Sequence, residues 1–246
     1  MEGNASIVEV KMKVKNIKIS NIPSTVWGEK SDKLIIAVHG NMSSKADTTI
    51  KVLAEEAVSL EYQVLSFDLP EHGDRKSEPT LCKVDNCVSD LKNVMEYAKS
   101  NWSTISLMAN SMGAYFSLLA YKDENIKQSM FLSPVVDMER IIKNMMGWFH
   151  ITEQMLFKEN EIATPIGQTL YWDYFEYVKN NPVEKWNIPT SILYGKKDEL
   201  CEYQFVSSFC KKFSCDLEIS LSSEHYFHTE EDIKIYRKWI RAKLIK

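Results

Sequence analysis

Short apolar runs recur along the chain, and each has the length of one strand. Unbroken apolar runs are typical of strands that are buried on both faces of a sheet. Five such strands are predicted: Leu34–Val38, Gln63–Phe67, Thr104–Met108, Gln128–Leu132 and Thr190–Tyr194. Helical periodicity fills the intervals and the C-terminus: Ala46–Leu60, Val84–Lys99, Ala114–Tyr121, Tyr203–Phe213 and Asp232–Leu244. This alternation predicts an α/β fold with a mostly parallel, doubly wound sheet.

Alternating apolar and polar residues mark the two ends of the predicted sheet. The runs Val8–Val14 and Ile17–Ile22 predict an antiparallel hairpin at one edge. The lysines between residues 11 and 15 alternate with apolar residues, which indicates a solvated strand face and not a phosphate-binding patch. Leu217–Leu221 also alternates and predicts the last strand.

The segment between Pro134 and Pro189 contains no clear buried strand and is too long for a plain loop. Its many methionines and aromatic residues predict a helical cap over the carboxyl edge of the sheet. The expected division is a core of residues 1–134 and 189–246 with an inserted cap of residues 135–188. Such residues either pack the cap's own underside or line an adaptable apolar pocket. Four are candidate pocket residues: Met145, Trp148, Phe149 and Trp172.

Composition narrows the class of protein. The 246 residues are 44% hydrophobic and 26% charged, and the formal net charge is -4. These values give a full core without the excess of basic residues that nucleic-acid binding requires, so we expect no nucleic-acid partner. Met1–Ser20 lacks the apolar core of a signal peptide, and no run is long enough to span a membrane.

The five cysteines are odd in number and show no C-x-x-C spacing. We interpret them as reduced thiols of a cytoplasmic protein, without a zinc site or a disulfide framework. No cluster of histidine, cysteine and carboxylate residues has a recognisable metal spacing, and no glycine-rich phosphate loop is present. The sequence specifies no oligomeric state.

Ser111 lies in Ala109-Asn110-Ser111-Met112-Gly113, directly after a predicted strand and before a predicted helix. A serine on such a sharp turn is exposed as a nucleophile in one large class of hydrolases, and the turn strains its backbone. The structural alternative is a serine that caps the following helix. The order of the candidate acid and histidine further along the chain favours the nucleophile.

A serine nucleophile needs a base, and the base needs a group that orients it. His225 follows the last predicted strand and is the preferred base, with His228 as the alternative. Asp198 follows the strand Thr190–Tyr194 and a glycine turn, and it is the preferred acid. Glu199 and Asp137 are the alternative acids: the first adjoins Asp198 and the second follows the preceding strand.

Backbone amides must also stabilise the oxyanion of an attacked carbonyl. One predicted donor is the amide of Met112, the residue after the nucleophile. The other is the amide of Asn41, with Met42 as the alternative, in the loop after Leu34–Val38. The histidines in this loop and in the next, His39 and His72, are expected to have structural roles. Asp68 is expected to tie down the second loop through bonds to its backbone.

Together these motifs resemble the α/β-hydrolase superfamily over nearly the whole chain. The matching pieces are His39-Gly40-Asn41, Phe67 to Gly73, Asn110 to Gly113, Gly195 to Asp198 and Glu224 to Phe227. The chain looks most similar to small cytosolic esterases of the cinnamoyl/feruloyl-esterase type, with monoglyceride lipases and serine aminopeptidase-like hydrolases as neighbours. The resemblance implies an α/β-hydrolase fold: an eight-stranded sheet, helices on both faces, and a cap after the sixth strand. One departure is Ala109, where the family usually has glycine.

The resemblance and the candidate triad Ser111, Asp198 and His225 predict a carboxylic-ester hydrolase that works through an acyl-enzyme and needs no cofactor. The apolar cap suggests a small-molecule substrate with an acyl or aryl group of moderate size. A peptidase or amidase with the same triad is the alternative within enzymes. A catalytically silent ligand-binding protein with the same fold is the alternative from another class.

Overall fold

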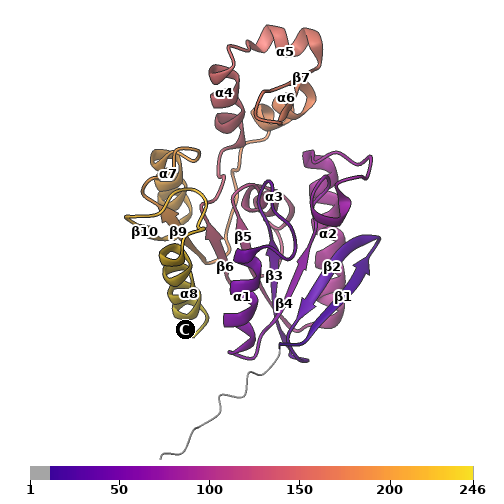
Figure 1. Ribbon diagram of the computed structural model, residues 1–246, viewed down its shortest axis with the longest axis vertical. Helices are drawn as coiled ribbons and strands as arrows, with labels where there is room; N and C mark the ends of the chain where they lie inside the picture. The colour runs from indigo at the N-terminus through magenta and orange to yellow at the C-terminus, as the bar shows by residue number, and fades with distance from the viewer. Residues whose placement is uncertain (1–11, 246) are drawn as a thin grey trace, which may run out of the picture.

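The computed structural model describes residues 12–245 and places a single large sheet at the centre of the molecule (Figure 1). Its strands are β1 (Val14–Ile19), β2 (Ile22–Trp27), β3 (Lys33–Val38), β4 (Gln63–Phe67), β5 (Thr104–Asn110), β6 (Ser129–Leu132), β9 (Thr190–Gly195) and β10 (Asp216–Ser220). The strand order is β1-β2-β4-β3-β5-β6-β9-β10. Only the pairs of β2 with β1 and β4 are antiparallel among these described strands. The predicted eight-stranded, mostly parallel sheet is therefore confirmed.

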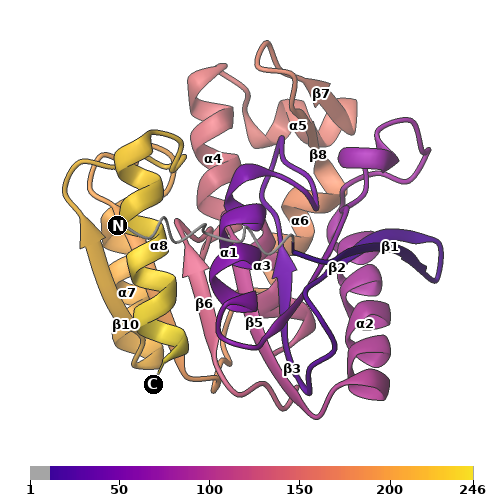
Figure 2. The same ribbon diagram turned by 60° about the horizontal axis from the view of Figure 1, so that its bottom comes forward.

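Helices cover both faces of this sheet. They are α1 (Thr48–Val58), α2 (Val84–Asn101), α3 (Met112–Ala120), α7 (Tyr203–Phe213) and α8 (Glu230–Leu244), with a short 3-10 turn at Gly73–Arg75. In β3, Ile35 and Ala37 pack in one core with residues of α1 and α8. Ile36 and Val38 point to the opposite core, which α2, α3 and α7 help to form (Figure 2). A strand with two buried faces needs no polar positions, which explains why the apolar runs predicted the central strands so well.

The predicted edge hairpin exists, but its strands are shifted along the chain. Most of the predicted first strand, Val8–Val14, lies outside the described residues. The two observed strands are joined by Ser20 and Asn21, both at positive φ (46° and 72°). Two residues at positive φ form a tight hairpin turn whose twist suits the strands, and asparagine tolerates this conformation. Asn16, at the predicted break, instead accepts a cross-strand hydrogen bond from the Thr25 hydroxyl at 2.9 Å.

The chain between β6 and β9 forms an insertion beyond the carboxyl ends of the central strands (Figure 1). It contains α4 (Met138–Trp148), α5 (Glu153–Glu159), β7 (Glu161–Ala163), β8 (Thr169–Tyr171) and α6 (Trp172–Asn180). The segment is thus not purely helical, because β7 and β8 pair in an antiparallel ladder. Three-residue strands carry no periodic signal that sequence patterns could reveal.

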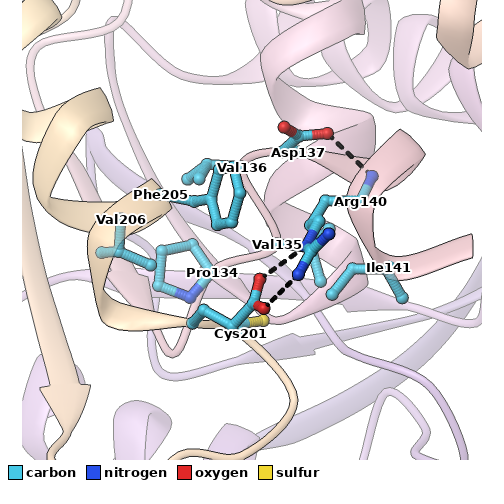
Figure 3. A pocket seen from close by; sticks show the side chains of 10 residues that line it. Pro134, Val135, Val136, Asp137, Arg140, Ile141, Cys201, Phe205 and Val206 are labelled. Carbon is cyan, nitrogen blue, oxygen red and sulfur yellow. Dashed lines mark hydrogen bonds and ion pairs between the residues drawn. The ribbon is translucent and has the colours of Figure 1, made fainter. Parts of the chain in front are cut away.

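An ion pair fastens the start of the insertion to the core. Arg140 of α4 donates to both carboxylate oxygens of Glu202, at 2.9 and 2.7 Å, and Glu202 directly precedes α7 (Figure 3). Asp137 accepts a hydrogen bond from the Arg140 amide at 2.9 Å and thereby caps α4. The crevice beside this pair has a volume of only about 10 Å³, so it cannot hold a substrate.

No helix within residues 12–245 combines the length and the apolar character that crossing a bilayer requires.

Candidate active site

Ser111 occupies a strained turn between β5 and α3. Its backbone angles are φ 48° and ψ -120°, a conformation that non-glycine residues rarely adopt. The turn is held by the neighbouring strand, since the Ser111 amide donates to the carbonyl of Leu132 at 3.0 Å. Gly113 lets α3 start close to β3, because a Cβ atom at this position would lie 2.4 Å from the carbonyl oxygen of His39. Ala109, two residues before Ser111, is accommodated in the core at 0% exposure.

The loop after β3 approaches the same turn from the side. A Cβ atom on Gly40 would lie 3.1 Å from the Cβ of Ser111, so glycine permits this close approach. The next residue, Asn41, is brought beside Ser111, and both residues border the same two cavities. Two loops that are distant in sequence thus meet at the carboxyl edge of the sheet, where α/β proteins bind their ligands.

His225 and Asp198 lie in loops after β10 and β9, and the structure brings both to Ser111. The Ser111 Oγ is 2.8 Å from Nε2 of His225, and Nδ1 of His225 is 2.8 Å from Oδ2 of Asp198. In the neutral tautomer that fits this chain of bonds, Nδ1–H donates to Asp198 and Nε2 accepts from the serine hydroxyl. His225 and Asp198 are 7% and 8% exposed, so little water competes for these bonds.

Backbone amides fix the position of the carboxylate. Oδ1 of Asp198 accepts hydrogen bonds from the amides of Leu200 at 2.9 Å and Cys201 at 2.8 Å. These donors leave Oδ2 for the histidine. Gly195 allows the turn before Asp198 to pass the histidine loop, because a Cβ atom there would lie 2.4 Å from the carbonyl oxygen of Glu224.

The residues weighed as alternatives lie elsewhere. Glu199 is exposed, and Asp137 caps α4. His228 is exposed, and its Nδ1 bonds to the carbonyl of Tyr226 at 2.8 Å. None of these three residues takes the place of Asp198 or His225 in the hydrogen-bonded chain that leads to Ser111.

The predicted oxyanion donors border Ser111. Met112 is the first residue of α3, and the first amides of a helix have no acceptor within that helix. Asn41 follows Gly40, and its Oδ1 lies 3.1 Å from Nε2 of His72. Met42 also lines both cavities, but its side chain is 81% exposed and its φ is 56°.

His39 has the structural role expected of it. The buried ring donates from Nδ1 to the carbonyl of Gly40 at 2.7 Å, and its Nε2 accepts from the amide of Leu69 at 3.0 Å. Burial lowers the pKa of His39 to about 4, so the ring stays neutral and keeps this tautomer at neutral pH. Asp68 organises the second loop as predicted, because its carboxylate accepts from the amides of Lys45 and Asp74.

Two cavities meet at Ser111. The larger has a volume of about 570 Å³ and extends under the insertion. The smaller, of about 450 Å³, runs between the start of α1 and the loop of His225. An electrophilic carbon held at Ser111 would therefore have room for a group on either side.

Part of the predicted pocket lies on the larger cavity. Met145 and Trp148 are among its lining residues, whereas Phe149 and Trp172 are not. Trp172 instead packs against Phe157 and Phe175, with ring centroids 5.1 and 5.9 Å away. Sequence reasoning missed several other lining residues: Met138, Ile141, Ile142, Gln168, Leu170 and Tyr174. The first three have helical spacing with Met145, which is the signal that could have found them.

Asp198, Cys201 and His225 place potential metal-ligand atoms within 4.8 Å of one another. Hydrogen bonds already explain this cluster, since both oxygens of Asp198 and Nδ1 of His225 are used. Burial also raises the pKa of the Cys201 thiol well above its usual range, which opposes the thiolate that a metal would require. The donor set therefore fits an acid that orients a histidine better than a metal centre.

Comparison with solved structures identifies the fold. No protein-family model and no curated protein sequence matches the chain. The chain is similar to Est1E from Butyrivibrio proteoclasticus, solved with bound ferulic acid, with a TM-score of 0.75 and 20% identity over 94% of this chain and 98% of Est1E. It is also similar to the mouse α/β hydrolase domain-containing protein 10 (TM-score 0.76, 15% identity, 95% of this chain and 98% of that chain). The esterase Pf2001 of Pyrococcus furiosus gives a TM-score of 0.72 at 19% identity, over 100% of this chain and 95% of that one. The chain therefore has the α/β-hydrolase fold.

Proposed function

We propose that this protein is a serine hydrolase that cleaves carboxylic esters through an acyl-enzyme. The observation that carries the proposal is the continuous chain of 2.8 Å hydrogen bonds from Ser111 through His225 to Asp198. A serine hydroxyl alone is a weak nucleophile at neutral pH, and a base oriented in this way activates it. The strained backbone of Ser111 and the adjoining cavities support the same role.

The proposed reaction has two steps. Ser111 attacks the ester carbonyl while His225 takes its proton, and the amides of Met112 and Asn41 stabilise the oxyanion. The C–O bond to the alcohol then breaks, and His225 returns the proton to the leaving oxygen. In the second step water attacks the acyl-enzyme with His225 again as the base, and the carboxylic acid is released. Asp198 holds the ring of His225 and stabilises the imidazolium that forms.

The shape of the site suggests a small ester. The larger cavity is lined by apolar side chains of α4, such as Ile142 and Met145, and by aromatic ones such as Trp148 and Tyr174. It suits an acyl or aryl group of moderate size. Est1E has been solved with ferulic acid, so feruloyl and other aryl esters belong in the first substrate panel.

Active-site labelling followed by a substrate panel tests this proposal. A fluorophosphonate should label the wild-type protein on Ser111, whereas Ser111→Ala should stay unlabelled. Ser117→Ala is the matched control, because Ser117 lies in the following helix and donates to the carbonyl of Gly113 within the core. We expect it to keep the label.

The panel compares p-nitrophenyl esters of increasing acyl size, feruloyl esters and aminoacyl amides. Faster turnover of esters than of amides supports the proposal. Preference for the amides would identify a peptidase or amidase instead. A folded wild-type protein that takes no label would indicate the catalytically silent alternative.

A further inference from the structure

A second group of reactive side chains lies on the wall of the larger cavity. Cys82, in the loop before α2, lines this cavity together with His72 and Ser111. Its sulfur lies 3.6 Å from the sulfur of Cys87, which is buried in the first turns of α2. Sequence reasoning missed this pair, because a separation of five residues matches none of the common motifs.

The surroundings of Cys82 favour its thiolate. The neighbouring Cys87 thiol and the His72 ring lower the pKa of Cys82 to about 6, although burial opposes the shift. Burial lowers the pKa of His72, but its proximity to Cys82 and its hydrogen bond to the carbonyl of Pro70 outweigh this effect and raise it. Burial raises the pKa of Cys87 well above its usual range. Cys87 therefore stays protonated, and its S–H group donates a hydrogen bond to the sulfur of Cys82. Within the pair, the cavity-facing sulfur is therefore the nucleophile.

We infer that Cys82 is an oxidation site for hydrogen peroxide, with Cys87 as the thiol that resolves the oxidised form. The Cys82 sulfur attacks one peroxide oxygen, the O–O bond breaks, and the products are a Cys82 sulfenic acid and one water. The Cys87 sulfur then attacks the Cys82 sulfur, the S–O bond breaks, and a disulfide and a second water form. Two thiols are oxidised and one peroxide is reduced, so atoms and electrons balance.

The geometry of the pair is suited to the second step. A disulfide bond is about 2.0 Å long, so the two sulfurs must approach by roughly 1.6 Å. Cys82 lies outside the helix, with partial exposure, and its loop can supply this movement. Peroxide can reach Cys82 through the cavity, whereas Cys87 is closed to solvent.

Peroxide treatment of the folded, full-length protein, followed by digestion and mass spectrometry, tests the inference independently of the proposed ester hydrolysis. Trypsin should cut after Lys76, Lys83 and Lys92, which puts Cys82 in peptide 77–83 and Cys87 in peptide 84–92. After limited peroxide, alkylation of the remaining thiols and non-reducing digestion, we expect the two peptides joined by a disulfide. Reduction should release them.

Cys210 and Cys215 are the internal control. They also form a neighbouring thiol pair, but they lie on α7 and before β10, and no histidine is among the groups that shift their pKa values. The Cys215 thiol also lowers the pKa of Cys210, but only Cys82 has a histidine beside it as well. We expect Cys82 to be oxidised at least about tenfold faster than Cys210 or Cys215, because the thiolate is the reactive form and His72 stabilises it further. Oxidation of Cys210 or Cys215 at peroxide doses that leave Cys82 free for alkylation would overturn the inference.

Two variants separate the two thiols. In Cys87→Ser the disulfide cannot form, while the serine hydroxyl keeps a hydrogen-bond donor beside the Cys82 sulfur, so Cys82 should accumulate as a sulfenic acid that dimedone traps. Absence of the dimedone adduct in this variant would also overturn the inference. His72→Gln should slow oxidation of Cys82 by about tenfold, since it removes one of the groups that stabilise the thiolate. If that variant fails to fold, the Cys87→Ser result still decides the matter.

Discussion

The two sides of the larger cavity are built in different ways. On the sheet side, hydrogen bonds with backbone groups fix Ser111 and Asp198, and a single added carbon at Gly113 would meet carbonyl oxygens. On the insertion side, the wall consists of side chains, some of them buried, such as Ile142 at 4%, and others exposed, such as Trp148 at 51%. The difference teaches that, in the proposed hydrolase, the sheet side would determine whether the reaction can occur at all. The insertion can change its side chains, and with them the choice of substrate, without disturbing the reacting atoms.

The largest effect is expected at the nucleophile. Ser111→Ala should lower kcat for p-nitrophenyl esters by about 10⁶-fold, because no other hydroxyl takes its place beside His225. The free energy of unfolding should change little, since Ser111 is only partly buried. Steady-state kinetics and urea unfolding measure the two quantities. Turnover within tenfold of the wild type would refute the role of Ser111.

Two aspartates at the ends of neighbouring strands give the next contrast. Asp198→Asn should lower kcat by about 10⁴-fold, because an amide cannot keep His225 in the required tautomer. Asp137→Asn is the matched control, because its carboxylate caps α4 and does not touch the histidine. It should keep kcat within about threefold and cost at most about 1 kcal/mol of stability. Equal losses of kcat in both variants would contradict the assignment.

Substituting one glycine on each side of the cavity tests which of the two regions is more rigid. Gly113→Ala should reduce the free energy of unfolding by about 2–4 kcal/mol, because its Cβ would lie 2.4 and 2.7 Å from the carbonyl oxygens of His39 and Val38. Gly147→Ala, in α4, has nothing within 4 Å of the added carbon and should gain roughly 0.5–1 kcal/mol. Urea unfolding measures both. A Gly113→Ala protein as stable as the wild type would show that the sheet edge can relax.

The smallest effect is expected on the insertion wall. Trp148→Ala should raise KM for a bulky aryl ester by about fivefold with kcat nearly unchanged, because it removes apolar contact area and no reacting group. Trp172→Ala should instead lower stability, because its ring packs against Phe157 and Phe175 and not on the cavity. If Trp172→Ala changed KM more than Trp148→Ala, the described cavity would not be the acyl site.

The same contrast explains what the sequence could predict. Buried strands such as β4 and the turn of Ser111 were predictable, because a strand buried on both faces and a sharp strand-to-helix turn each leave a local pattern. The edge hairpin lies further along the chain than predicted. Its turn consists of Ser20 and Asn21, which are ordinary surface residues and give no clear turn signal in the sequence. Phe149 and Trp172 could not be separated from Met145 and Trp148, because composition does not tell which side of a short helix faces a cavity. The Cys82–Cys87 pair depends on how a loop folds back on a helix, which no local pattern encodes.

The position of Ser111 at the junction of two cavities has a consequence for the fate of the products. In the proposed mechanism, an ester that fills both hollows would be cut at the point where they join. The alcohol fragment could then depart from one chamber while the acid is still attached to the serine in the other. Water can enter through the vacated chamber and reach the trapped fragment from the side that the alcohol has left.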